Sequence, residues 1–145
     1  MDSLRIRTIV PEDAEAAAEL SAQLGYVCDT TEMRTRIDRL TLLPHRAVFV
    51  AELEGTIAGW VDASLECHLQ SEDVVVIGGL VVKDGIRGHG IGWQLCQAVE
   101  AWGRDLGVKK IRVRSQIKRS EAHRFYLQRG YEQVKTSAVF EKSLN

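Results

Sequence analysis

The sequence predicts an α/β fold with a mixed sheet, formed by a single domain. Strand-like segments alternate with amphipathic helical segments along the whole chain, which favours layered helices and a sheet. The segment 74–82 is apolar at both alternating sets of positions, as expected of a central strand covered on both faces. With 145 residues and 45% apolar content, the chain is long enough for one substantial core, and residues 1–145 are predicted to form one domain.

The elements of the first half follow from periodicity and from turn residues. Residues 4–9 alternate apolar and charged side chains, which predicts an opening strand. Pro11 and the acids after it begin a helix that Gly25 ends, and a second helix covers residues 29–43, before Pro44. Strands 47–53 and 57–68 flank the Glu54-Gly55 pair, which predicts a hairpin turn.

The second half alternates strands and helices more regularly. Strand 74–82 precedes a helix over residues 90–106 that Gly107 closes. Strand 108–114 follows, then helix 120–128 with Gly130 as its cap, then a hairpin of strands 131–135 and 138–142. The predicted order is therefore β-α-α-β-β-β-α-β-α-β-β.

Composition excludes several classes of partner. The net charge is −1, from 19 basic and 20 acidic residues, so neither nucleic acid nor an anionic membrane is predicted as a partner. The N-terminus does not resemble a signal peptide, and no apolar run reaches the roughly 18 residues of a spanning helix. The three cysteines, Cys28, Cys67 and Cys96, are widely spaced, which fits reduced thiols in a cytoplasmic protein. The four histidines lack metal-site spacing, so no metal is predicted.

A glycine-rich turn joins strand 74–82 to the helix that begins near Gly90. Such a turn exposes backbone N–H groups, and the helix N-terminus adds partial positive charge, so the segment suits phosphate. A P-loop is excluded because no lysine follows Gly90, and a dinucleotide fingerprint is excluded because Trp93 replaces its third glycine. The pattern that remains is R-x-x-G-x-G, from Arg87 to Gly92.

This pattern resembles the pyrophosphate loop of the GCN5-related N-acetyltransferases, the GNAT superfamily, which bind acetyl-CoA. A second segment, residues 122–131, resembles the A-x-x-F-Y-x-x-x-G-[FY] signature of the same superfamily. The predicted order of elements is also similar to the order in this family. The resemblance covers the whole chain and implies the GNAT fold with a splayed central sheet. The C-terminal half is similar to aminoalkylphosphonate N-acetyltransferases and other small-amine acetyltransferases.

The resemblance implies two groups of acetyl-CoA contacts. The backbone of Leu80, Val81 and Val82 is expected to bond the pantetheine arm, as an added strand bonds a sheet edge. The N–H of Val82 is the expected donor to the thioester carbonyl. The residues expected to bracket the pyrophosphate are Arg87, Gly88, His89, Gly90, Ile91, Gly92 and Trp93.

For catalysis, the resemblance implies that Tyr126 faces the CoA sulfur and protonates or hydrogen-bonds the departing thiolate. Gly79 occupies the position at which the aminoalkylphosphonate enzymes carry a glutamate. The general base must therefore come from elsewhere, and Glu66 and His68 are the candidates because they belong to one polar face of strand 57–68. That face consists of Trp60, Asp62, Ser64, Glu66 and His68. The alternatives are an ordinary solvent-exposed strand face and, for the tyrosine, an aromatic core residue.

One departure from the family pattern is Arg119, which stands where an asparagine often holds the pantetheine. The predicted function is transfer of an acetyl group from acetyl-CoA, as co-substrate, to a primary amine of a small molecule, by direct attack and without a metal. Acetylation of a protein N-terminus or lysine is one alternative, and a non-catalytic acyl-CoA sensor is another. The resemblance also implies a homodimer, which the closing hairpin could mediate.

Overall fold

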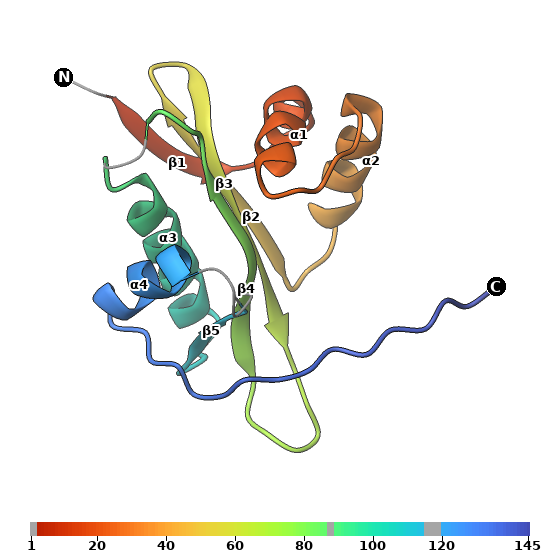
Figure 1. Cartoon of the computed structure of the whole chain (residues 1–145), viewed down its shortest axis with the longest axis vertical. Coiled ribbons are helices and arrows are strands. Elements are labelled where there is room, and N and C mark those ends of the chain that lie inside the picture. Colours follow the sequence, from red (N-terminus) through yellow and green to blue (C-terminus); the bar gives the residue numbers. More distant parts are fainter. Residues whose placement is uncertain (1–2, 87–88, 115–119) are drawn as a thin grey trace. The chain divides into compact units, whose positions relative to one another are not determined.

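The computed structural model describes residues 3–86, 89–114 and 120–145. The chain divides into two compact units, Met1–Arg114 and Ser115–Asn145. Within the described part of the first unit, the elements in chain order are β1 (Leu4–Thr8), the 3-10 helix η1 (Pro11–Asp13), α1 (Ala14–Gln23), α2 (Thr30–Leu40), β2 (Arg46–Leu53), β3 (Thr56–Glu66), β4 (Val74–Val82), α3 (Ile91–Asp105) and β5 (Ile111–Val113) (Figure 1).

A five-stranded sheet forms the first unit, and its strands lie in the order β1-β2-β3-β4-β5. The first four are antiparallel neighbours, whereas β4 and β5 pair in parallel over three residues. The predicted mixed sheet is confirmed. The turn between β2 and β3 also follows the prediction, since Glu54 and Gly55 have φ of 50° and 82°, the left-handed values that a tight hairpin requires.

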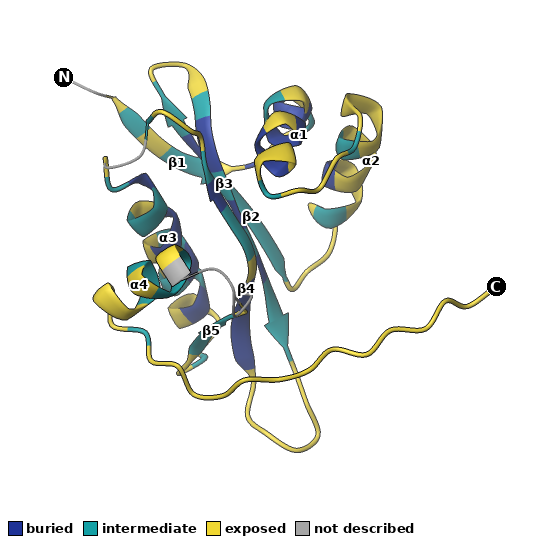
Figure 2. Ribbon diagram, in the orientation of Figure 1, coloured by how far each residue is buried: buried dark blue, intermediate teal, exposed yellow. Residues whose placement is uncertain are grey.

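Helices cover both faces of this sheet: α1 and α2 lie on one face and α3 on the other (Figure 1). On the first face Ile9, Ala17, Ile37 and Val50 form a buried cluster, against which Trp60 of β3 packs. On the other face α3 contributes Ile91, Leu95 and Val99, each at most 2% exposed. Strand β4 lies between these layers and its first four residues are buried (Figure 2), as the apolar pattern predicts.

An ion-pair network ties the start of the chain to the sheet. Arg7 of β1 donates to both carboxylate oxygens of Asp13, at 2.8 and 2.9 Å, and also to Glu52 of β2. Asp13 is buried, which acts to raise the pKa of its carboxyl. The hydrogen bonds from Arg7 and from the Val10 N–H outweigh burial and lower that pKa. The sequence predicts Asp13 only as an acid at the start of a helix. In the structure its carboxylate also holds η1 to β1 through Arg7.

The second unit contains α4 (Ser120–Gln128), after which Gly130 adopts φ of 88°. The predicted hairpin of strands 131–135 and 138–142 is wrong, because residues 131–145, all described, contain no strand. Val139 and Phe140 are more than 90% exposed. Two strands without a sheet or a helix to cover them bury too little apolar surface to be stable.

Candidate active site

Strand β4 extends beyond the end of its neighbour β5. The pairing stops at Ile77 and Val113, after which the Arg114 N–H donates to the carbonyl of Ile77 at 3.3 Å. On the other side, Asp62 of β3 pairs with Gly79, whereas Ala63 pairs with Ile77. An extra residue on one strand is a β-bulge, and bulges redirect the chain and often lie at functional sites. Within the described residues, β4 therefore has an unpaired edge from this bulge onward.

Leu80 and Val82 present their backbone groups to that edge. The Lys83 N–H donates to the carbonyl of Ala58 on β3 at 2.8 Å, and successive residues of a strand point their polar groups to alternate sides. The groups of Val82 and Leu80 consequently face away from β3, and those of Val81 face toward it. Of the three residues expected to bond pantetheine, Leu80 and Val82 thus present their backbone groups to the unpaired edge, and Val81 does not.

The side chain of Gln23, from α1, bridges the end of β4 and the turn after it. Its Nε2 donates to the carbonyl of Val82 at 3.1 Å, and its Oε1 accepts from the Asp84 N–H at 3.1 Å. This amide fixes where the strand stops and the glycine-rich turn begins. Sequence reasoning did not identify it, because the contact joins residues about sixty positions apart.

The N-terminus of α3 follows this turn. Gly90 is the N-cap, with φ of 73°, and Ile91, Gly92 and Trp93 form the first turn. The first N–H groups of a helix have no acceptor within it, and no acidic residue lies in the first turn of α3. This end therefore suits a phosphate oxygen. His89 is exposed just before it; Arg87 and Gly88 lie outside the described residues.

Tyr126 lies on α4, in the second unit. Its half-buried ring makes edge contacts with the rings of Phe125 and Tyr131, with centroids 5.3 and 5.8 Å apart. The Tyr131 N–H also bonds the Tyr126 carbonyl, at 3.1 Å. The aromatic residues of the second motif thus support one another within this unit.

Glu66 and His68, the predicted base candidates, contact each other. His68 Nε2 lies 2.9 Å from Glu66 Oε1, and Arg114 donates two hydrogen bonds to the same carboxylate, at 2.8 and 2.9 Å. Hydrogen bonding by Arg114 lowers the pKa of Glu66, which makes the carboxylate a weaker base. Glu66 pairs with Val74, at the start of β4, so this cluster lies far along the sheet from Gly79.

A second cluster lies directly beside the bulge. Asp62 is opposite Gly79 on one side and Val48 on the other, and its carboxylate forms an ion pair with Arg46. Burial raises the pKa of Asp62, although Arg46 opposes this shift. Two residues before it, Trp60 places its ring over Gly79. Alternation already put Asp62 on the polar face, but only the register of the strands shows which member of that face lies at the bulge.

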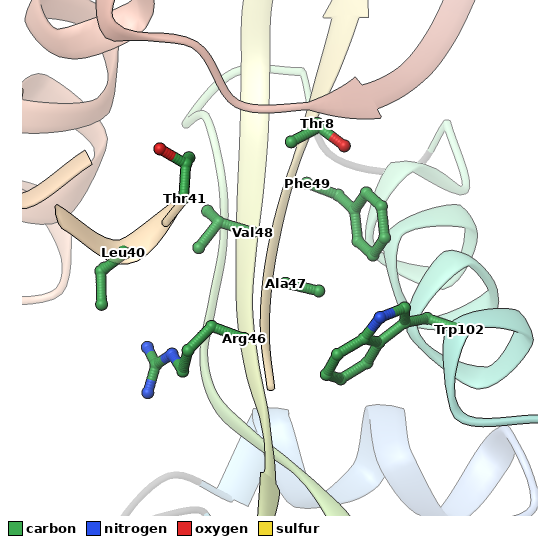
Figure 3. Close-up of a pocket in the computed structure, with 8 residues that line it drawn as sticks. All are labelled: Thr8, Leu40, Thr41, Arg46, Ala47, Val48, Phe49 and Trp102. Carbon is green, nitrogen blue, oxygen red and sulfur yellow. The ribbon is translucent and has the colours of Figure 1, made fainter. Parts of the chain in front are cut away.

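The structure also contains a cavity of about 190 Å³ at the start of β2 (Figure 3). Most of its lining is apolar or hydroxyl-bearing, and its residues are Thr8, Leu40, Thr41, Arg46, Ala47, Val48, Phe49 and Trp102. None of the predicted site residues lines it. In the described part of the chain, no cluster of three or more His, Cys, Asp or Glu residues could hold a metal ion. Nor is any described helix long and apolar enough to cross a membrane.

Comparison with known proteins gives the class of protein to which this arrangement corresponds. The aminoalkylphosphonate N-acetyltransferase of Salmonella typhimurium is 36% identical over 135 residues, covering 92% of this chain and 88% of that protein. An aminoglycoside N(6′)-acetyltransferase type 1 of Stenotrophomonas maltophilia is 28% identical, covering 96% and 93%. The solved structure of the aminoglycoside N-acetyltransferase AAC(6′)-Iy in complex with CoA has the same fold, with a TM-score of 0.88 at 22% identity, covering 99% and 97%.

The chain is thus an acetyl-CoA-dependent acyltransferase of the N-acetyltransferase class. The sequence model of the acetyltransferase (GNAT) family matches residues 14–131, and this chain belongs to that family. The family and fold that the two motifs predicted are confirmed.

Proposed function

We propose that this enzyme transfers the acetyl group of acetyl-CoA to a primary amine of a small molecule. The observation that carries the proposal is the similarity along nearly the whole chain to an aminoalkylphosphonate N-acetyltransferase and, at lower identity, to an aminoglycoside N-acetyltransferase. Both of those proteins are named for small acceptors that carry an amine. An aminoalkylphosphonate carries a phosphonate group and an aminoglycoside carries sugar rings, so the amine is the group that the two acceptors share. We therefore assign an amine, and no other group, to the acceptor of this enzyme.

In this proposal the unpaired edge of β4 and the N-terminus of α3 hold acetyl-CoA. The outward-facing groups of Leu80 and Val82 bond the pantetheine arm, and Val81 supports them within the sheet. The Val82 N–H donates to the thioester oxygen, where negative charge develops during attack. The residues assigned to the pyrophosphate are Arg87, Gly88, His89, Gly90, Ile91, Gly92 and Trp93. The absence of an acid in the first turn of α3 supports this assignment.

The reaction in this proposal is a direct transfer. The free amine attacks the thioester carbon and forms a tetrahedral adduct, the C–S bond breaks, and the amide and the thiolate of CoA result. Tyr126 donates a hydrogen bond or a proton to the thiolate. A tyrosine pKa near 10 against about 8.5 for a thiol makes full proton transfer uphill by roughly 2 kcal/mol, so hydrogen bonding is the larger part of its role. The steps of this proposed transfer do not use a metal ion.

The test measures thiol release from acetyl-CoA by the purified protein. The acceptor panel contains aminoalkylphosphonates, aminoglycosides, polyamines, amino acids and short peptides, each with a no-amine control. We expect amine-dependent release with at least one small acceptor. Release only with peptides would favour a protein substrate. Silence across the panel, while calorimetry shows acetyl-CoA binding, would refute the transferase proposal and favour a sensor.

We also propose that the protein is a single domain, forms a homodimer and is cytoplasmic. The family match extends from the first unit into the second, which supports one domain. The chain after α4 exposes four apolar side chains, Val134, Val139, Phe140 and Leu144, and a second copy of this chain would bury them. None of Cys28, Cys67 and Cys96 forms a disulfide in the described structure, in keeping with a reducing compartment. Light scattering should give a dimer mass, and Phe140→Asp should reduce it toward a monomer.

A further inference from the structure

The sheet surface beside Gly79 carries a carboxylate that the predicted site did not use. We propose that Asp62 binds the ammonium group of the acceptor and then takes a proton from its nitrogen during acetyl transfer. The proposal rests on the proposed function, since it requires the acceptor to be an amine and the thioester to lie at the edge of β4 near Val82.

The register of the sheet places Asp62 within reach of that point and Glu66 beyond it. Val82 pairs with Gly59, three residues before Asp62. Three residues of strand span about 10 Å, which the aspartate side chain, a hydrogen-bonded nitrogen and the thioester carbon can bridge. Glu66 is seven residues from the same point, or about 23 Å. The side chain of Glu66 is also engaged by Arg114 and His68.

The packing of Trp60 explains why the carboxylate comes from β3. A Cβ atom added to Gly79 would lie 2.9 and 3.1 Å from two atoms of the Trp60 ring. These distances are shorter than ordinary van der Waals contacts, so a glutamate at position 79 would have to displace the indole. On the next strand, Asp62 pairs with Gly79 and brings a carboxylate to the same level of the sheet without that displacement.

The surroundings of Asp62 suit a group that binds an ammonium ion. Arg46 Nη2 donates to Oδ1, whereas Oδ2 has no hydrogen-bond partner among the described residues, so it can accept an N–H from the substrate. Val48 from β2 and Gly79 from β4 lie opposite it, and Arg46 is the charged group that acts on it within the described part of the chain. Because burial raises the pKa of this carboxyl against the effect of Arg46, Asp62 is a better proton acceptor than Glu66.

The proton balance of the transfer then follows. The acceptor ammonium, held by Asp62, loses its first proton to solvent and becomes the nucleophile. Attack forms the new C–N bond and leaves the nitrogen of the tetrahedral adduct positively charged, with a proton that is more acidic than that of the free ammonium. Asp62 takes this second proton. The adduct collapses, the C–S bond breaks, and the electron pair leaves with the CoA sulfur; Asp62 then returns its proton to water.

The experiment compares Asp62→Asn with Asp13→Asn. Both substitutions neutralise a carboxylate that pairs with an arginine, but Asp13 lies in the anchor of β1 and does not belong to the proposed site. We expect Asp62→Asn to lower kcat/KM for the amine about 10²-fold to 10⁴-fold, the range for a lost acid–base group, with acetyl-CoA affinity unchanged. Asp13→Asn should lower the melting temperature and leave kcat/KM unchanged below it.

A third variant tests whether Asp62 is the group whose protonation limits kcat/KM at low pH, which a purely structural role would not predict. Arg46→Met removes the charge that opposes protonation of Asp62, so the acidic limb of the kcat/KM profile should move to higher pH. An unshifted limb, or full amine turnover by Asp62→Asn, would overturn the assignment, and so would an equal loss in Asp13→Asn. A large loss in Glu66→Gln with Asp62→Asn unaffected would transfer the role to Glu66. If the wild type itself acetylates no amine, the proposed function fails first.

Discussion

Substituting Gly59 by alanine tests the close approach of β3 and β4 beside the proposed thioester site. The new Cβ would lie 2.7 Å from the carbonyl oxygen of Val81, 3.3 Å from a Leu95 methyl group and 3.4 Å from the Cα of Val82. The closest of these atoms belongs to the backbone of a paired strand, so the clash cannot be relieved by rotating a side chain. Overpacking of this kind costs about 1–3 kcal/mol, equivalent to a fall of about 3–10 °C in melting temperature.

Gly78→Ala is the matched control, since among the described residues a Cβ there meets a single atom, 4.0 Å away. This change should alter the free energy of unfolding by less than about 1 kcal/mol. Thermal and urea unfolding of the two variants measure the difference. The Val81 carbonyl belongs to the same peptide group as the Val82 N–H, so the clash at position 59 should displace that N–H. The Gly59→Ala variant should therefore also lose turnover at temperatures where it is folded. Equal stability of the two alanine variants would refute the packing argument.

Three further predictions concern single residues. Because the pKa of Asp13 is lowered in the folded protein, its contribution to stability is present above its ordinary pKa of 3.8 and is lost as the pH falls through the lower folded value. Unfolding of Asp13→Asn should therefore depend less on pH in acid than unfolding of the wild type does; parallel curves would contradict the Arg7 pairing. Tyr126→Phe should lower kcat roughly 10-fold to 100-fold through a lost hydrogen bond to charge, and unchanged turnover would exclude the role. Val82→Pro removes an N–H that faces away from β3, so it should lower kcat about 10²-fold to 10³-fold at little cost in folding, whereas Val81→Pro, which removes an N–H that faces β3, should unfold the sheet.

The order and type of the elements in the first unit could be predicted from sequence because each has a local signal. Proline at the start of the first helix, the Asp29 cap whose carboxylate accepts from the Glu32 N–H, and the Glu54-Gly55 turn all act through neighbouring residues. Element ends were less predictable. The second helix ends at Leu40 and the fifth strand covers only Ile111–Val113, because tertiary partners determine where pairing stops.

The closing hairpin failed for a related reason. Residues 131–135 and 138–142 contain aromatic and β-branched side chains on either side of the polar pair Thr136-Ser137, which is typical of two strands and a turn. Whether such a segment becomes a strand depends on a partner edge. Three of its apolar side chains, Val134, Val139 and Phe140, together with nearby Leu144, can be buried only by chain elsewhere. Val139 and Phe140 remain more than 90% exposed in this structure. The side-chain pattern of a segment indicates which of its residues could be buried. It does not indicate which other part of the protein would cover them.

The choice among the polar residues of β3 shows the same limit at the active site. Alternation puts Asp62, Glu66 and His68 on one polar face with equal weight, and Glu66 and His68 are the candidates that the sequence analysis names for the base. The register with β4 separates the two by about 13 Å along the strand, and the bulge between Ile77 and Gly79 determines which of them lies level with the unpaired edge. The carboxylate of Glu66 already pairs with Arg114 and His68, so an ammonium group would add little to its stabilisation. The half-buried carboxylate of Asp62 has an oxygen without a partner among the described residues and gains a counter-ion when the substrate arrives, so binding of the acceptor and readiness for proton transfer are coupled at Asp62.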